Sequence, residues 1–168
     1  EVSAILNITP DHLNRHHTME AYVSAKKNIA RNQTEDDHCI LNYEDRLTRE
    51  FGENIRAQVL YFSSRRKLEK GIYLEDGKII YRTEGTTETC GVEELNLLGV
   101  HNYENVMAAA AMALVYGVPA EIVRESVKAF KGVEHRIEYV AEKNGVAYYN
   151  DSKGTNPDAA IKGIQAMN

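Results

Sequence analysis

The chain has 168 residues, of which 43% are hydrophobic and 27% are charged. This composition is typical of a globular protein with one good hydrophobic core and part of a second, and it excludes a disordered or fibrous chain. The formal net charge of −5 argues against a nucleic-acid-binding domain, because such domains carry a concentrated basic surface. The basic run at residues 65–67 is interpreted as a solvated loop.

Two cysteines, Cys39 and Cys90, match no metal-binding spacing and are too few for a disulfide framework. No apolar run approaches the roughly twenty residues that a membrane span needs, and no signal peptide is recognisable. We therefore expect a protein of the reducing cytoplasm, with neither nucleic acid nor a membrane as partner. Because the chain begins with Glu1 and reaches an apolar run almost at once, we also expect it to be a piece of something longer.

The first elements are a strand and an amphipathic helix. Residues 4–8 form a short apolar run that ends at Thr9-Pro10, which predicts a strand of a parallel sheet buried on both faces. Thr18 is a helix cap, and Glu20 lies in the first turn that follows it. The apolar stripe of this helix comprises Met19, Tyr22, Val23, Lys26, Ile29 and Ala30, so the stripe directs one lysine inward.

Alternating strands and helices follow. Residues 38–42 and 57–62 are predicted strands with a helix ending near Phe51 between them, which indicates right-handed βαβ units. Residues 71–74 and 78–82 flank an Asp-Gly pair and predict a hairpin. With residues 86–92 as a third strand, this hairpin makes a small antiparallel sheet after the parallel one.

Two helices precede a domain boundary. Asn102 is placed to cap the first helix, whose inner face would carry Val106, Met107, Ala110 and Leu114. The second helix spans about residues 120–130, with Ile122, Val123, Val127 and Phe130 on one side. The helical pattern ends at Lys131-Gly132, so we predict one domain over residues 1–132 and the start of another over residues 133–168.

The second domain begins with a hairpin and a polar loop. Residues 137–142 and 146–150 alternate around Asn144-Gly145, and a helix with Pro157 at its first position follows. Between them, residues 149–158 read YNDSKGTNPD. A strand that runs into a glycine-containing polar loop and a helix start is typical of a nucleotide pocket, because backbone N–H groups gather there. Asp151 and Lys153 add an acceptor and a cation. An ordinary turn aspartate that bonds its own backbone stays the alternative for Asp151.

His12 and Lys26 are candidate metal ligands. His12 and His16 have the i, i+4 spacing of a shared metal, but Leu13 stands where a zinc protease carries glutamate, which disfavours a zinc hydrolase. His16 and His17 as exposed turn residues are the alternative. Burying an unpaired Lys26 ammonium would cost several kcal/mol. The side chain avoids this cost either by snorkelling, with its charged end at the surface, or by reaction with CO₂ to a carbamate that binds Mg²⁺ beside His12.

Two residues are candidates for contact with a nucleotide. The Asn102 side chain offers a donor and an acceptor to an adenine edge, and a helix cap is its structural alternative. The Arg136 guanidinium is able to reach a phosphate across the domain boundary, whereas an interdomain ion pair is the alternative.

Five segments together resemble the Mur ligases of peptidoglycan synthesis. They are LNITPDHLNRH at residues 6–16, YVSAK at 22–26, GVHN at 99–102, HRIE at 135–138 and NDSKGTN at 150–156. The resemblance implies an α/β fold in which a truncated parallel-sheet ATP-binding central domain with a small antiparallel sheet precedes the first strands and helix of a Rossmann-like C-terminal domain. The NDSK segment resembles the branch of the family that adds D-glutamate.

The resemblance also implies an activity with ATP and Mg²⁺ as cofactors. The carboxylate of UDP-N-acetylmuramoyl-L-alanine would be phosphorylated to an acyl phosphate and then attacked by the amine of D-glutamate. Lys26, as its carbamate, and His12 would hold Mg²⁺, and Lys153 would lie near the reacting centre. Asn102 would face adenine, Arg136 the phosphates and Asp151 the ribose.

The chain departs from the family in three ways. Asn14 and His17 replace an aspartate and a glycine, which puts the loop shape in doubt. No G-x-x-x-x-G-K-[ST] phosphate loop occurs in the sequence, and the family carries it further upstream. We therefore expect a fragment that lacks the N-terminal domain, the phosphate loop and most of the C-terminal domain, and that is inactive alone. A non-catalytic α/β module that binds a nucleotide or a partner is the alternative.

Overall fold

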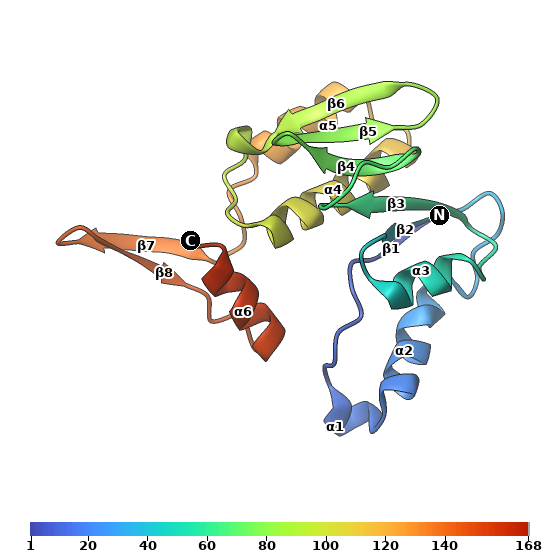
Figure 1. The fold of residues 1–168 in the computed structure, drawn as a ribbon, viewed down its shortest axis with the longest axis horizontal. Helices are drawn as coiled ribbons and strands as arrows, with labels where there is room; N and C mark the ends of the chain where they lie inside the picture. Colours follow the sequence, from blue (N-terminus) through green and yellow to red (C-terminus); the bar gives the residue numbers. More distant parts are fainter. Residues whose placement is uncertain (168) are drawn as a thin grey trace.

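The computed structural model describes residues 1–167 and has a six-stranded sheet at its centre (Figure 1). The strands lie in chain order, and the first four are parallel. They are β1 (Val2–Ile5), β2 (His38–Asn42), β3 (Gln58–Ser63), β4 (Gly71–Glu75), β5 (Lys78–Arg82) and β6 (Thr86–Gly91). The predicted α/β class is confirmed.

The antiparallel strands extend the parallel sheet, because β4 pairs with β3 in parallel and then with β5 in antiparallel. Asp76 and Gly77 join β4 to β5 with φ of 49° and 73°, the positive values that a tight hairpin turn needs. The hairpin and the third strand that the sequence predicts are both present.

β1 ends earlier than predicted, at Ile5, because side chains take over the backbone groups that follow. The Asn42 side chain donates to the carbonyl of Leu6 at 3.0 Å. The Asp45 carboxylate accepts from the N–H of Ile8 at 2.6 Å and also caps α3 (Arg46–Gly52). Ile8 is still buried. The chain after β1 therefore leaves the sheet as an anchored loop that leads into the site described below.

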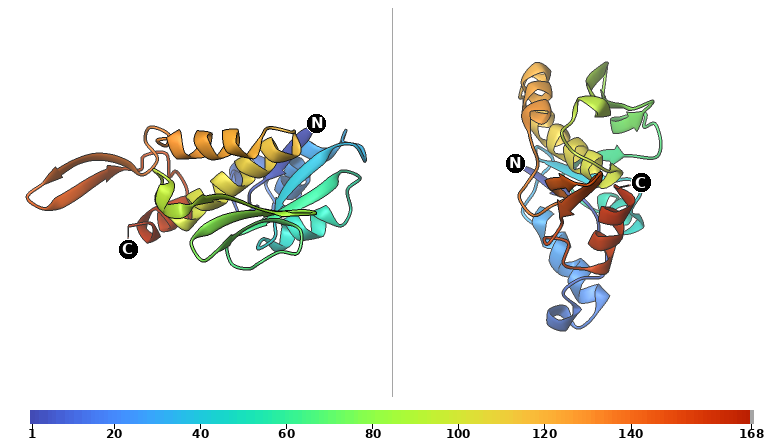
Figure 2. Two further views of the ribbon diagram at one scale, coloured as in Figure 1. Left: turned by 90° about the horizontal axis from the view of Figure 1, so that it is seen from above. Right: turned by 90° about the vertical axis from the view of Figure 1, so that its left-hand side faces the viewer.

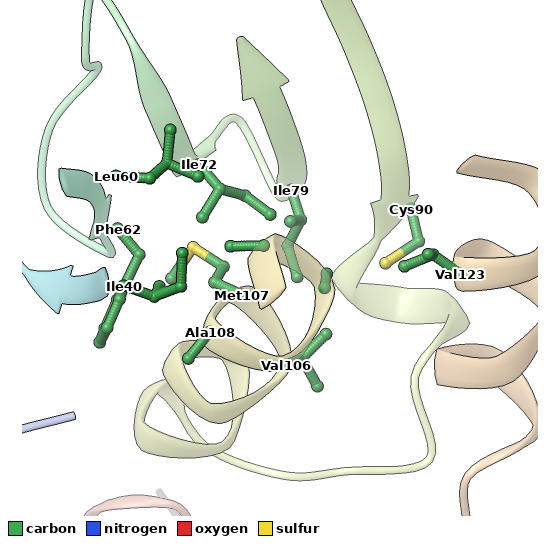
Figure 3. Close-up of a cluster of buried hydrophobic side chains, with 12 residues drawn as sticks. Ile40, Leu60, Phe62, Ile72, Ile79, Cys90, Val106, Met107, Ala108 and Val123 are labelled. Carbon is green, nitrogen blue, oxygen red and sulfur yellow. The ribbon is translucent and has the colours of Figure 1, made fainter. Parts of the chain in front are cut away.

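Helices cover both faces of the sheet. α4 (Val100–Val115) and α5 (Ala120–Ala129) pack on one face, and α2 (Met19–Lys27) and α3 pack on the other. The short α1 (Leu13–His16) and the 3₁₀ turns at Asn28–Ala30 and Val92–Glu94 complete this part. In β2, Ile40 faces α4 while Cys39 and Leu41 face the opposite layer, so alternate residues of one strand serve two cores. Figure 3 shows Met107 of α4 among Ile40, Phe62 and Ile72 of the sheet.

Three details of the helices differ from the prediction. Gly99, with φ of 89°, occupies the cap position of α4, so Asn102 lies inside the first turn and is not the cap. Glycine alone reaches this φ without steric cost, and the chain turns into the helix there. Lys26 is exposed and does not point inward. On α5, Val123 is buried, whereas Ile122 and Phe130, the residue that follows the helix, are about half exposed.

Residues 133–167 form a separate lobe, which we call the second lobe; residues 1–132 are the first lobe. The second lobe consists of β7 (Glu138–Lys143), β8 (Val146–Asn150) and α6 (Pro157–Gln165). The hairpin projects away from the six-stranded sheet, and α6 lies between the hairpin and the first lobe (Figures 1 and 2). The turn at Asn144-Gly145 and Pro157 at the helix start are as predicted.

No helix within residues 1–167 is long and apolar enough to cross a membrane.

Candidate functional site

A cleft of about 260 Å³ lies between the two lobes. The loop after β1, α2 and the first turns of α4 form its first-lobe wall, while the lobe connector, the polar loop after β8 and the start of α6 form the other. Four of the six predicted site residues line it: Lys26, Arg136, Asp151 and Lys153. The fold thus brings together side chains from residue 26 to residue 153.

The polar loop after β8 is held to the lobe connector by hydrogen bonds. Asp151 Oδ1 accepts from the N–H of Ile137 at 3.1 Å, and the N–H of Lys153 donates to the carbonyl of His135 at 2.9 Å. The N–H of Gly154 closes the turn onto the carbonyl of Asp151 at 2.9 Å. The Asp151 carboxylate therefore stands at the cleft wall on a fixed backbone, and it accepts from Ile137, fourteen positions away, and not from its own turn as the alternative had it.

Lys26 reaches the cleft from α2 by snorkelling. Its Nζ lies 5.3 Å from the centroid of the Tyr22 ring, and Tyr22 itself is buried. The ring supports the charged end at the edge of the cleft, a favourable cation–π arrangement. The structure contains no buried ammonium at this position, so burial does not demand a modified lysine.

His12 lies outside the residues that line the cleft. Its side chain is 70% exposed, and its Nε2 lies 3.6 Å from Asp11 Oδ2. His16 instead packs on Tyr22, with ring centroids 5.3 Å apart. The two histidines thus contact different neighbours, and within residues 1–167 there is no group of three His, Cys, Asp or Glu side chains that could hold a metal.

Asn102 lies beside a neighbouring apolar hollow of about 490 Å³. It is buried, its Nδ2 donates to the carbonyl of Leu98 at 2.7 Å, and its Oδ1 accepts from Asn105 at 3.3 Å. Arg136 lines both this hollow and the cleft. The lining of the hollow includes Leu97, Asn102, Asn105, Val106, Ala109, Val127, Phe130, Val133 and Arg136. An apolar chamber with two amides thus adjoins a charged cleft.

The charged lining of the cleft is larger than the sequence predicted. It adds Lys162 to the three predicted cations, and it adds the carboxylates of Asp11, Glu104 and Asp158 to that of Asp151. Lys162 is paired with Asp158 at 3.0 Å, and Glu104 accepts from Ser64 at 2.6 Å. Asp11 lies in one of the motif segments, which was the available signal for it, whereas nothing local marked Glu104 or Lys162.

His101 also lines the cleft, in the first turn of α4. Burial lowers its pKa below the ordinary histidine value, and the nearby positive charges of Lys162 and Arg136 lower it further. Glu104 and Asp151 act in the opposite direction. The imidazole is therefore neutral near pH 7 and faces the cleft as a polar group without charge.

Comparison with known proteins identifies the family. Residues 1–113 match the model of the Mur ligase middle domain. The chain is 61% identical over 168 residues to the UDP-N-acetylmuramoylalanine–D-glutamate ligase of Lachnoclostridium phytofermentans. It is 59% identical to the protein of the same name from Lachnospira eligens. Each match covers 99% of this chain and 37% of the relative, so the chain spans little more than a third of their length.

A solved structure of MurF from Acinetobacter baumannii shares the fold, with a TM-score of 0.79 and 23% sequence identity. The match covers 98% of this chain and 36% of that one, and both lobes fall within it. The fold, the order of the motif segments and the match of the middle-domain model agree with one another. The chain belongs to the Mur ligase family.

Proposed function

We propose that this chain is part of an ATP-dependent ligase that joins D-glutamate to UDP-N-acetylmuramoyl-L-alanine in peptidoglycan synthesis. The observation that carries the proposal is the interlobe cleft, where Lys26, Arg136, Asp151 and Lys153 converge. Relatives with 61% and 59% identity, both named for this activity, support the choice of substrates. The fold alone would not distinguish this reaction from other ligations.

ATP fits the two adjoining hollows. The apolar chamber beside Asn102 and Asn105 is suited to adenine, because a side-chain amide pairs with an adenine edge and the aliphatic walls exclude water. Arg136, which lines both hollows, would contact the phosphates. Asp151 would accept hydrogen bonds from the ribose. The buried Asn102 amide already donates one N–H to Leu98 and accepts one bond from Asn105, which leaves its second N–H and its second lone pair for a nucleotide.

Mg²⁺ also fits the cleft through its oxygen donors. Mg²⁺ keeps several waters and binds through one or two carboxylates plus substrate phosphates, so it does not require a complete protein cage. When bound, it neutralises phosphate charge during phosphoryl transfer. We propose Lys26, as its carbamate, and His12 as the residues that hold it. His12 would have to turn towards the cleft from its exposed position, and Asp11 next to it already lines the cleft.

The cations of the cleft would position and stabilise the reacting groups. Phosphorylation of the muramoyl-alanine carboxylate gives an acyl phosphate, and the amine of D-glutamate displaces phosphate from it. Charge builds up on the phosphoryl oxygens in both steps, and fixed cations stabilise that charge. Lys153 is the residue that we place nearest the reacting carbon, on the loop held by His135.

We also propose that residues 1–132 and 133–168 belong to two domains. A two-stranded hairpin is marginally stable by itself, and β7, β8 and α6 expose large apolar side chains. These are Tyr139, Val140, Val146, Tyr148, Tyr149, Ile161 and Ile164. Further chain that covers them would complete the second domain. The nucleotide substrates and the two free, buried cysteines fit a cytoplasmic enzyme.

The test measures phosphate release by the full-length gene product supplied with ATP, Mg²⁺, UDP-N-acetylmuramoyl-L-alanine and D-glutamate. We expect release that depends on both substrates, and none from residues 1–168 alone. Release with another amino acid in place of D-glutamate would overturn the substrate assignment. Tight ATP binding without any ligation would favour the non-catalytic module instead.

The carbamate has its own test. We expect a ¹³C carbamate signal in protein equilibrated with ¹³CO₂ and Mg²⁺, and we expect Lys26→Ala to abolish it. An unmodified amine at Lys26 under those conditions would contradict the assignment.

A further inference from the structure

Asn156 joins the two lobes across the cleft. It caps α6, where its Oδ1 accepts from the N–H of Ala159 at 2.8 Å. Its Nδ2 donates to Asp11 Oδ2 at 3.3 Å, although the two residues are 145 positions apart. Within residues 1–167, this is the one side-chain hydrogen bond between the first and the second lobe.

The first-lobe partner, Asp11, also shapes the segment that carries His12. Asp11 Oδ1 accepts from the N–H of His12 at 2.8 Å, while Oδ2 lies 3.6 Å from His12 Nε2. His12 has φ of 52°, a left-handed conformation that costs a non-glycine residue energy and needs support from its surroundings. The Asp11 carboxylate supplies that support on one oxygen and receives Asn156 on the other.

We propose that Asn156 is a positioning residue: its bond to Asp11 is a latch that holds the cleft closed and fixes the Asp11 carboxylate, which lines the cleft. The proposal rests on the proposed function in taking the cleft as the active site. When α6 moves away, the Asp11 carboxylate loses a partner. When the lobes close, the same carboxylate is held from both sides. Lobe position and the position of the Asp11 carboxylate are thereby coupled.

The chemistry of the two contacts explains why asparagine suits this position. The cap requires an acceptor and the latch requires a donor, and the asparagine amide presents both on one short side chain. Aspartate caps a helix equally well but offers no donor, and it would place a second carboxylate against Asp11. Asn156→Asp therefore breaks the latch while it keeps α6 capped. Adding Asp11→Asn to it reverses donor and acceptor and restores one hydrogen bond.

The decisive measurement is the distance between the lobes in the full-length gene product. Spin labels are placed at Glu20→Cys on α2 and Glu142→Cys on β7, both exposed positions. Cys39 and Cys90 are fully buried and stay unlabelled, and any other exposed cysteine is replaced by serine. We expect one main distance for the parent protein and a longer population in at least half of the Asn156→Asp molecules. The double variant should return to the parent distribution.

The parent distribution in Asn156→Asp, or no recovery in the double variant, would overturn the latch. Asn156→Ser serves as the second variant, since serine caps the helix without adding charge; it should open the lobes less than Asn156→Asp does.

A second readout tests the effect on Asp11, whose carboxylate lines the cleft. In the ligase assay we expect Asn156→Asp to raise the half-saturating Mg²⁺ concentration by about tenfold, the scale of a lost supporting contact at a metal site. The maximal rate should fall less, and the double variant is judged by the lobe distance alone, because Asp11→Asn itself removes a carboxylate from the cleft. Open lobes with unchanged Mg²⁺ dependence would refute the positioning role. A gene product without ligase activity would overturn the proposed function, while the distance measurement would still decide on the latch.

Discussion

The carboxylate of Asp151 lies directly against the backbone of Gly163, where an added β-carbon would stand 2.6 Å from Asp151 Oδ2. Gly163 is inside α6, where glycine costs about 1 kcal/mol relative to alanine. The missing side chain allows α6 to pass close to the loop that carries Asp151. The position of the proposed ribose ligand therefore depends on a residue twelve positions further along the chain.

Gly163→Ala should weaken ATP binding by about tenfold, because Asp151 or α6 must move and one hydrogen bond to a charged group is worth roughly 1.5–3 kcal/mol. The stability of the protein should change little, because the gain of about 1 kcal/mol in helix propensity from alanine offsets the cost of moving Asp151 or α6. Calorimetric titration with ATP and thermal unfolding measure the two effects. Gly85→Ala is the control, because no atom lies within 4 Å of its added β-carbon. Unchanged ATP affinity in Gly163→Ala would show that Asp151 does not depend on this contact.

Lys26→Ala should lower the turnover number by at least about a hundredfold, the scale of losing a stabilising group at a reacting phosphate. Because Lys26 is exposed, the unfolding free energy of the protein should change by no more than about 0.5 kcal/mol. The adjacent Lys27 provides the control: its Nζ lies 5.6 Å from the Phe51 ring, and it does not line the cleft. Lys27→Ala should keep near-parent turnover. Equal losses of turnover and stability in Lys26→Ala would assign it a structural role.

Protonation of His101 should destabilise the folded protein as the pH falls. Its pKa is lowered in the folded state, first by burial and then by Lys162 and Arg136, so the unfolded chain binds the proton more readily. The stability contributed by the neutral form is present above the ordinary pKa of about 6.5 and is lost as the pH drops through and below that value. The melting temperature of His101→Gln should therefore fall less than that of the parent between about pH 7.5 and about pH 5. An equal fall in the melting temperature of the parent and of His101→Gln over this pH range would contradict a destabilising protonation of His101.

Thr89→Val should stabilise the protein by about 1 kcal/mol. The Thr89 hydroxyl is buried in β6, and within residues 1–167 it has no hydrogen-bond partner, which costs about 1–3 kcal/mol. Valine has nearly the same shape and needs no partner. The exposed Thr87 in the same strand is the control, so Thr87→Val shows how much of any gain comes from strand propensity alone. Urea unfolding at equilibrium measures the unfolding free energy of both variants. An equal gain in Thr89→Val and Thr87→Val would show that the unpaired Thr89 hydroxyl is not the cause.

The parts of the fold that were predictable are those with local signals. Asp76-Gly77 and Asn144-Gly145 form their turns because their own backbones favour positive φ, and Thr18 caps α2 through a residue three positions away. The end of β1 was misplaced because the side chains that set it are distant in the chain, whereas the start of α4 was misplaced although its signal, Gly99, is local. Asn42 and Asp45, which end β1, come from more than thirty positions further on, and Gly99 outcompetes Asn102 by its φ.

The sequence by itself determined the α/β class, the order of the elements, the family and four of the residues that line the cleft, Lys26, Arg136, Asp151 and Lys153, because periodicity, turn residues and contiguous motifs carry this information. Only the tertiary structure decided that Lys26 lies at the surface on Tyr22, that His12 stands outside the cleft, and that Glu104, Lys162 and Asn156 belong to it. Asn156 and Asp11 are 145 positions apart, and their short side chains meet only because the sheet and the helices bring the two backbones close together. No short segment of the sequence encodes that placement.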